Sequence, residues 1–307
     1  MHKLLAISMV AFLAACGGGG GASGNPPFGP ALVPFTSFTA VQANTTADMR
    51  GMSTVVNGTL SGGNVTSLTP PATDTATTTG RLTYDGTRTL SAVSAVTPGG
   101  SISFSRSAND TFTCNSGACG LTNAAGTASM VIMEPTTMPA PVNFNYQTFG
   151  AWNRLSSSTS FDAGVFSLGA ATPASAVPVT GTATFNGLAN GFFAPSAGAA
   201  VFTTANMTAI ANFQAQSISF STTNTQTVSL VNGATTPNGN LNLTGTFNYQ
   251  PGSNLFSGAV ATAPASTIQM SGTGTGRFYG PTAQEIGGIY NLNGTGGSMI
   301  GSFGGKQ

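Results

Sequence analysis

Apolar and polar residues alternate along most of the chain. In residues 241–249 the apolar positions 241, 243, 247 and 249 are separated by Asn and Thr, and residues 217–221 alternate Ser with Ile and Phe. Successive side chains of a β-strand point to opposite faces, so this period of two predicts strands with one buried face. No long stretch repeats at a period of 3.6 residues. We therefore expect an all-β protein with almost no helix in the mature chain.

The strand pattern predicts two β domains. Pro135, Pro139 and Pro141 cluster between alternating runs, which is typical of a linker, so we divide the chain near residue 140. Residues 35–140 form a β-rich first domain in this interpretation. Residues 145–307 form an antiparallel β-barrel of roughly eight strands. The strands of the second part are expected at 144–152, 160–168, 177–186, 199–212, 215–223, 240–249, 255–261, 269–279, 285–292 and 298–304.

Asn-Gly and Asp-Gly pairs recur throughout the sequence. Such pairs favour the two-residue type I′ turns of β-hairpins, because both central positions need a positive φ. We therefore expect hairpin turns at these pairs. They begin at Asn57, Asp85, Asn186, Asn190, Asn232, Asn238 and Asn293.

Charge is sparse, and its scarcity excludes several classes of function. Charged residues make up 5% of the chain and the formal net charge is +1. Without a basic stripe to neutralise phosphates, we predict no nucleic-acid binding. The one histidine is His2, inside a predicted cleaved segment. A mature chain without histidine has no Ser-His or Cys-His dyad and no imidazole metal site, so we predict no enzyme activity, catalytic residue, metal site or cofactor.

The N-terminus predicts export and lipid anchoring. A short basic start is followed by an apolar run at residues 4–13 that suits a signal peptide and is too short to span a bilayer. Leu13-Ala14-Ala15-Cys16 looks like a bacterial lipobox, which would make residues 1–15 a signal peptide and Cys16 the lipidated residue. The alternative is an ordinary secretory signal with a chance cysteine. Gly17, rather than Asp, argues by the same resemblance against retention in the inner membrane.

Residues 16–34 are rich in Gly and Pro and are interpreted as a tether. A chain of that length places the folded part about 20–25 Å from the membrane. Low-complexity sequence of no selected length is the alternative.

Two further cysteines, Cys114 and Cys119, stand in the string Cys-Asn-Ser-Gly-Ala-Cys. The exported compartment is oxidising, so we predict a disulfide at the tip of a small hairpin. A metal site would need further ligands, and a redox-active pair would depart from the Cys-x-x-Cys spacing of thioredoxin-like motifs.

The C-terminal residues carry a specific string. Residues 276–288 read G-R-F-Y-G-P-T-A-Q-E-I-G-G, and S-F-G-G-K follows at 302–306. This predicts a strand, a Gly-Pro corner, a second strand and a third strand from Met299 to Phe303. The string resembles the closing strands of the β-barrel of the transferrin-binding protein B family of bacterial surface lipoproteins. Residues 146–152 resemble the opening strand of such a barrel, and 208–213 with 217–220 resemble its central hairpin.

The resemblance covers roughly residues 145–307 and carries expectations for the rest of the chain. It implies that 35–140 is a handle-like domain, on order and length alone. It also implies an outer-membrane, surface-exposed lipoprotein. Its partners would be an extracellular protein or small solute, an outer-membrane transporter and a surface-lipoprotein assembly protein. The chain has room for one handle and one barrel, and it lacks the charged loops of a receptor for a large protein.

Few side chains in the second part suggest chemistry. Asp162 and Glu285 are its carboxylates, and a glycosidase would need two that lie close together. We interpret Glu285 instead as accepting hydrogen bonds at the Gly-Pro corner or pairing with Arg277. Trp152 is expected in the core, with a ligand platform as the alternative. Tyr279 is structural, or ligates haem iron through its oxygen.

The sequence thus favours a non-catalytic binding lipoprotein for iron, haem or another solute, with cofactor-binding and ligand-binding residues unknown. The alternative is a structural or adhesive envelope lipoprotein without a soluble ligand. An enzyme is the third hypothesis, and it would depend on Asp162 or Glu285.

Overall fold

The computed structural model describes residues 31–115, 117–134 and 143–307. The predicted signal peptide, Cys16 and the three prolines of the predicted linker lie outside these ranges. Within them the only helical pieces are three-residue 3-10 turns, namely η1 (Arg106–Ala108), η3 (Ala174–Ala176) and η4 (Gly239–Leu241). No helix in the described part of the chain is long and apolar enough to cross a bilayer.

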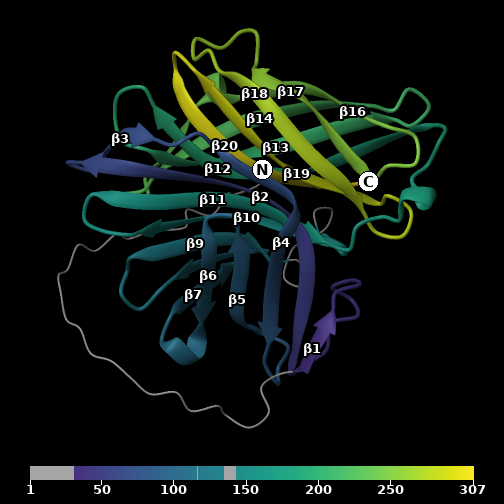
Figure 1. Cartoon of the computed structure of the whole chain (residues 1–307), viewed down its shortest axis with the longest axis horizontal. Coiled ribbons are helices and arrows are strands. Elements are labelled where there is room, and N and C mark those ends of the chain that lie inside the picture. The colour runs from purple at the N-terminus through teal and green to yellow at the C-terminus, as the bar shows by residue number, and fades with distance from the viewer. Residues whose placement is uncertain (1–30, 116, 135–142) are drawn as a thin grey trace.

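The first sheet takes in the strands up to residue 169 (Figure 1). Over the described residues it has 11 strands, in the order β6-β5-β4-β2-β11-β10-β9-β8-β7, with β1 and β3 paired to β2. Their bounds are β1 Ala31–Pro34, β2 Thr45–Ser61, β3 Asn64–Leu68, β4 Ala72–Tyr84, β5 Leu90–Thr97, β6 Gly100–Ser105, β7 Thr111–Asn115, β8 Ala118–Thr122, β9 Ala128–Met133, β10 Gln147–Leu155 and β11 Ser160–Gly169. β1 pairs parallel to β2, and the other pairings are antiparallel.

The second sheet closes into an antiparallel barrel. β12 through β20 follow the order β13-β12-β20-β19-β18-β17-β16-β14-β15, and β13 also pairs with β14, which closes a ring of eight described strands with β15 outside it. The bounds are β12 Thr182–Pro195, β13 Val201–Asn212, β14 Ser217–Ser229, β15 Thr235–Pro237, β16 Leu243–Tyr249, β17 Leu255–Thr262, β18 Ser271–Tyr279, β19 Glu285–Gly294 and β20 Gly297–Lys306. Closure leaves no unpaired edge in the ring. The predicted all-β fold, a handle-like domain followed by a barrel of about eight strands, is confirmed.

The buried side chains form three cores, one inside each sheet and one between the two sheets. The barrel interior is filled by rings such as Phe220, Phe247 and Phe303. The first sheet curls around a second core that includes Trp152 and Phe166. A third core lies between the sheets, where Phe149, Val165 and other residues of β10 and β11 meet residues of β12, β13, β19 and β20. The predicted core position of Trp152 is confirmed, since its side chain is buried.

β10 and β11 correct the predicted division near residue 140. The sequence placed 144–152 and 160–168 in the barrel wall, with 146–152 as its opening strand. Both strands instead lie at the centre of the first sheet, and the chain changes sheets between β11 and β12. The physical reason is burial on both faces: Phe149 faces the barrel while Trp152 faces the core of the first sheet. Alternation identifies strands, but it does not say which sheet a doubly buried strand joins.

Several predicted turns are also wrong. β2 runs straight through Asn57-Gly58, and β12 runs through the pairs at Asn186 and Asn190. None of these six residues has a positive φ. Their glycines allow close approach instead: a Cβ at Gly187 would lie 1.9 Å from the carbonyl oxygen of Gly304, and one at Gly58 would lie 2.5 Å from the ring of Phe161. The pairs at Asp85 and Asn232 do lie in turns.

The predicted closing strands are confirmed as β18, β19 and β20, with the Gly-Pro corner between β18 and β19. Residues 208–213 and 217–220 form the β13–β14 hairpin of the barrel, also as predicted.

Candidate functional site

A cleft opens between the two sheets at one end of the molecule. It encloses about 560 Å³ and is bordered by the connections β2–β3, β3–β4, β8–β9, β12–β13 and β14–β15 and by the ends of β10, β11, β19 and β20. These connections meet there because β2, β10 and β12 all end at this side, while their antiparallel partners begin there. A volume of this size falls in the roughly 300–1,000 Å³ range of small-molecule sites. This cleft is the candidate functional site.

Aliphatic side chains make most of the cleft wall. Its deep part is continuous with the core between the sheets, through Val56, Ala163 and Ile300. Its mouth carries Leu155, with 44% of its surface exposed, and Val231, with 71% exposed. Large aliphatic side chains at these exposures are costly to leave in water, so the mouth is suited to contact an apolar ligand.

One charged side chain lines the cleft among the described residues, and it is already paired. Arg154 donates from Nε and Nη2 to Oδ2 of Asp162, at 3.1 and 2.6 Å. Its Nη1 donates to the carbonyl oxygen of Ser101 at 3.2 Å. Asn57 donates to the other oxygen of Asp162 at 2.6 Å. The pair is therefore neutral as a unit, with both carboxylate oxygens and three of the five guanidinium N–H groups engaged, which leaves the cleft without a net charge.

The opposite end of the interface is held by Glu285. This buried carboxylate, the first residue of β19, accepts from the backbone N–H groups of Asn145 and Tyr146, which lead into β10. Lys306 on β20 donates from Nζ to the carbonyl oxygen of Asn143 at 3.1 Å and to its side-chain oxygen at 3.3 Å. Burial raises the pKa of Glu285 to about 7, against the opposing effects of the two N–H groups and Lys306.

The predicted pairing of Glu285 with Arg277 is wrong. Arg277 stands opposite Gly287 in the β18–β19 ladder, and its Nη2 donates to the carbonyl oxygen of Thr75 in the first domain. Tyr279 is the residue opposite Glu285. The predicted role of Glu285 as a hydrogen-bond acceptor next to the Gly-Pro corner is what the structure shows, with donors from the two residues that lead into β10.

Further polar contacts join β10 and β11 to the barrel along the same interface. Gln147 donates to the carbonyl oxygens of Ile286 at 2.8 Å and Gly305 at 3.2 Å. The hydroxyls of Ser167 and Tyr279 are 3.0 Å apart. Tyr279 is completely buried, and burial raises its pKa. A phenol enclosed in this way does not face an open site, so the structure gives it the structural role and not that of a haem ligand.

Asp162 and Glu285 lie far apart. They contact opposite ends of β10, at Arg154 and Asn145 respectively, which places them roughly 25–30 Å apart along that strand. A pair of glycosidase carboxylates lies within about 10 Å, so these two do not form one. No cluster of three or more His, Cys, Asp or Glu side chains suited to a metal ion occurs in the described ranges.

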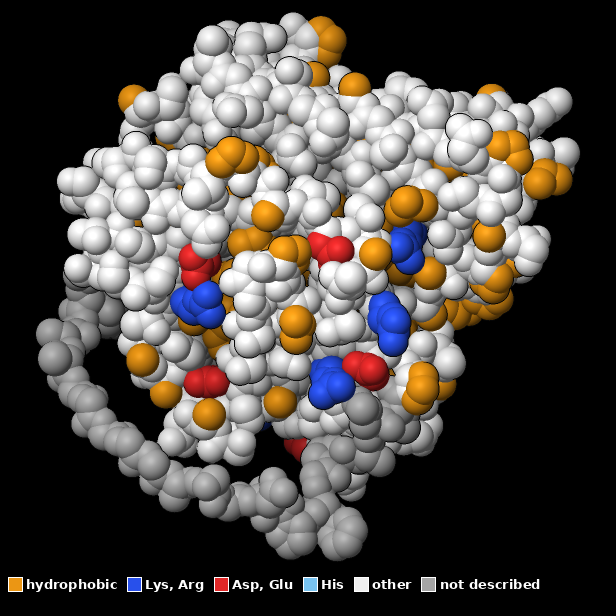
Figure 2. Space-filling model, in the orientation of Figure 1, with side chains coloured by type: hydrophobic (Ala, Val, Ile, Leu, Met, Phe, Trp, Pro, Cys, Tyr) orange, Lys and Arg blue, Asp and Glu red, His pale blue; other side chains and the backbone are white. Residues whose placement is uncertain are grey.

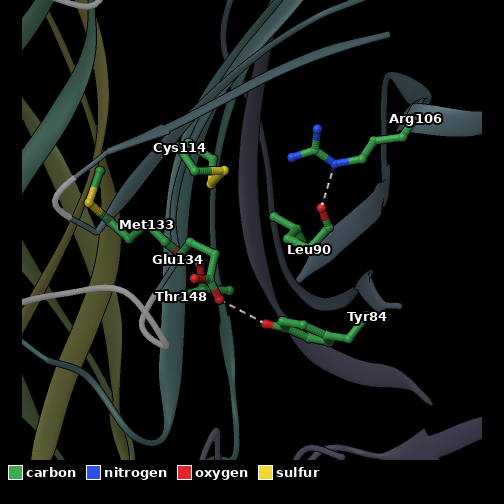
Figure 3. Close-up of a disulfide and its surroundings, with 8 residues drawn as sticks. Tyr84, Leu90, Arg106, Cys114, Met133, Glu134 and Thr148 are labelled. Carbon is green, nitrogen blue, oxygen red and sulfur yellow. Dashed lines mark hydrogen bonds between the residues drawn. A yellow bond between two sulfur atoms is a disulfide. The ribbon is translucent and has the colours of Figure 1, made fainter. Parts of the chain in front are cut away.

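The disulfide joins Cys114 on β7 to Cys119 on β8, next to the β9 strand (Figure 3). The cysteines stand opposite each other in the ladder, and Cys119 is buried in the core of the first domain. Nearby, the hydroxyl of Tyr84 donates to Glu134 at 3.1 Å, and burial first and Glu134 second raise the pKa of that phenol. The bridge lies in the first domain, on β7 and β8, and neither cysteine lines the cleft.

Replacing both cysteines by alanine is expected to lower the free energy of unfolding by about 2 kcal/mol, because the closed loop is short. Chemical denaturation of the double variant against the wild type, both without reductant, measures this. A loss above about 4 kcal/mol would contradict a loop-closure effect of this size.

Cys16 lies outside the described residues, but the first described strand shows where the tether joins the fold. β1 pairs with residues 45–48 of β2, and the cleft borders β2 from Val56 onward. Val56 lies eleven residue steps beyond Thr45 along β2, roughly 36 Å. In Figure 1 β1 and β3 accordingly lie on opposite sides of the molecule. The cleft thus lies away from the end that the tether joins.

Sequence reasoning did not find the cleft. Its lining comes from strand ends and connections that are far apart in the sequence, and residues such as Leu60, Ala200 and Val231 have no shared motif. The available signal was an apolar pair, Leu230-Val231, placed directly before an Asn-Gly turn where solvent-exposed residues are usual.

Comparisons with known proteins find a family model for the barrel part of the chain and several similar solved structures. Residues 177–307 match a family model described as the C-lobe and N-lobe β-barrels of transferrin-binding protein B. No curated protein matches the chain. Transferrin-binding protein B of Haemophilus parasuis is similar at 16% identity over 83% of this chain and 45% of that one, with a TM-score of 0.48. This chain therefore spans a little under half of that protein.

Two further solved structures are similar over parts of the chain. Transferrin-binding protein B of serogroup B Neisseria meningitidis matches at 17% identity, over 83% of this chain and 65% of that one, with a TM-score of 0.39. The N-lobe of lactoferrin-binding protein B of Moraxella bovis matches at 13% identity, over 55% and 78%, with a TM-score of 0.37.

Proposed function

We propose, from the premise that residues 177–307 are a transferrin-binding protein B-type barrel, that this chain is a non-catalytic binding lipoprotein of the bacterial outer membrane. It captures a small solute in the cleft between its two sheets. The observation that carries the proposal is the uncharged, aliphatic cleft of about 560 Å³ on the end away from the tether. A site placed there faces outward from a membrane to which Cys16 would be anchored.

A binding role also agrees with the chemistry of the described residues. The two carboxylates that a hydrolase would need lie at opposite ends of β10, and Glu285 is committed to backbone N–H groups. The solved relatives are named for binding transferrin and lactoferrin. An extracellular protein partner, an outer-membrane transporter and a surface-lipoprotein assembly protein extend the proposal by family analogy, which supports function only by association.

Iron or haem is not the solute that the cleft favours. Haem iron needs a His, Cys, Tyr or Met ligand, and among the described lining residues only Met299 is of these types. The haem propionates would need cations, whereas Arg154 is already paired with Asp162.

A structural or adhesive envelope role is the second candidate. The barrel, residues 177–307, holds only three charged residues, Arg277, Glu285 and Lys306. Figure 2 shows the charged side chains of the displayed face gathered over the lower part of the molecule, with the upper part nearly free of them. This role predicts no saturable ligand, so a titration of the protein with an apolar ligand distinguishes the two candidates.

Surface display is tested by protease treatment of intact cells that produce the protein. We expect the protein to be digested while a periplasmic marker stays intact, as judged by blotting. A Cys16→Ala variant is the control, and we expect it to leave the membrane fraction. Protection of the wild-type protein would contradict surface exposure and place the binding role inside the envelope.

A further inference from the structure

We propose that the cleft between the sheets binds a single alkyl chain that carries an uncharged polar head, so that its ligands are neutral monoacyl lipids such as monoacylglycerols. This inference rests on the proposed function and names the ligand class of the same site.

The first argument is the kind of apolar surface in the wall. Its side chains are mainly Val, Leu, Ile, Ala and Pro, and the aromatic members are Phe161 and Phe192. Phe192 stacks edge-on against Phe202 at 5.7 Å, within the core between the sheets. Flat aromatic ligands are held by exposed ring faces, whereas branched aliphatic walls pack against a flexible hydrocarbon. The lining therefore suits an alkyl chain better than a planar ring system.

The second argument is the charge at the site. The single cationic lining residue, Arg154, gives two hydrogen bonds to Asp162 and one to Ser101. An anionic head would compete with Asp162 for this guanidinium and so weaken a partly buried ion pair. No acidic side chain lines the described cleft to receive a cationic head. A neutral head meets neither penalty.

The third argument is the polar rim. The deep wall is aliphatic, while hydroxyl and amide groups stand toward the turns, including Thr127, Asn153, Asn293 and Ser298. Asn293 accepts from its neighbour Gly294 and from Ser298, so these groups already form short local networks of neutral donors and acceptors. The hydroxyls of a glycerol head are both donors and acceptors and can join such a network without a counter-ion.

The chain's own lipid is the alternative occupant. The tether joins the fold at β1, about 36 Å along β2 from the nearest cleft residue, Val56. The sequence-based length of the tether is only about 20–25 Å. The Cys16 end of the tether therefore falls short of the cleft on average, which favours a lipid supplied from outside.

The test uses the full chain with Cys16→Ala, so that no detergent is needed. The neutral fluorophore N-phenyl-1-naphthylamine is titrated first, then displaced with 1-lauroylglycerol or with laurate, which has the same chain and a charged head. We expect saturable binding with one site, and displacement by 1-lauroylglycerol at a concentration at least tenfold lower than by laurate.

Matched variants locate the site. Leu155→Asp puts a charge at the cleft mouth, and Ile210→Asp makes the same change on the barrel wall at a residue that does not line the cleft. The two side chains are 44% and 46% exposed, so the folding cost should be similar. We expect at least tenfold weaker binding of 1-lauroylglycerol for Leu155→Asp and less than twofold for Ile210→Asp. Leu155→Ala should give an intermediate loss, and circular dichroism checks each fold.

Four outcomes would overturn the inference. Equal or tighter binding of laurate would show that a charged head is accepted. Equal losses in Leu155→Asp and Ile210→Asp would place the lipid elsewhere. Binding of the fluorophore that depends on Leu155 but is not displaced by 1-lauroylglycerol would reject the ligand class while leaving the proposed binding function intact. Absence of binding by both compounds would remove the cleft as a site for either proposal.

Discussion

Replacing Gly304 by alanine is expected to lower the free energy of unfolding by about 3 kcal/mol, which corresponds to a melting temperature roughly 6–12 °C lower. A Cβ at this position would lie 2.4 Å from Cε1 of Phe149, a fully buried ring of β10. The ring belongs to the core between the sheets, so it can move away only by displacing other buried side chains. Thermal unfolding followed by circular dichroism measures the shift.

A loss of stability on Gly304→Ala is informative, because a Gly→Ala change without a clash usually raises the free energy of unfolding by restricting the unfolded chain. Gly239→Ala is the matched control in the same domain. Gly239 is exposed, its φ is not positive, and the nearest atom to an added Cβ would be Nδ2 of Asn242 at 3.7 Å. A loss below about 1 kcal/mol in Gly304→Ala would show that β10 does not pack on the barrel as closely as described.

The second large effect is a dependence of stability on pH through Glu285. Its folded pKa of about 7 lies above the ordinary value of 4.5, so the folded state holds the proton more tightly than the unfolded state. The contribution of this protonated side chain to the free energy of unfolding is therefore fully present below pH 4.5 and is lost as pH rises through 7. A difference of this size corresponds to about 3 kcal/mol. Urea unfolding at intervals from pH 4.5 to 8 measures it.

Glu285→Gln removes the titration, and we expect it to flatten the slope between pH 4.5 and 7. Both oxygens of Glu285 carry lone pairs whether or not it is protonated, whereas the amide has one acceptor oxygen, so the N–H of Asn145 or Tyr146 is left facing an NH₂ group. We expect a cost of about 1–3 kcal/mol at low pH for that unpaired donor. Asp74, whose pKa is lowered to about 2, titrates below this window and serves as an internal contrast. An unchanged slope in Glu285→Gln would assign the pH dependence to another group.

The sequence was only partly informative about the surroundings of Gly304 and Glu285. The string around Glu285 predicted the two strands and the Gly-Pro corner, because turn residues and alternation are local signals. It also suggested Arg277 as a partner, eight residues away. The observed partners are backbone groups about 140 positions earlier, brought there by β10. No local pattern encodes such a contact.

The Asn-Gly pairs are a second case in which the local sequence was not sufficient. Asn-Gly at residues 186–187 and 190–191 carries the composition of a turn, yet β12 continues through both pairs. Gly187 and Gly191 are needed because β20 passes close beside them, with carbonyl oxygens about where a Cβ would stand. A glycine indicates a position where a side chain is not tolerated. Only the surrounding structure shows whether the reason is a positive φ or the close approach of a neighbouring strand.

The sequence by itself determined that the chain is all β, that its C-terminal strands 271–306 form a hairpin sequence, and that its second part closes as a barrel. Those properties follow from the period of two, from turn chemistry and from a specific string. Only the tertiary structure decided that β10 and β11 join the first sheet, that Glu285 holds them to the barrel, and that the loop ends enclose an uncharged cleft. The reason is that backbone hydrogen bonds pair strands of almost any sequence. The choice of partner therefore depends on which apolar faces can be buried together, a property of the whole fold.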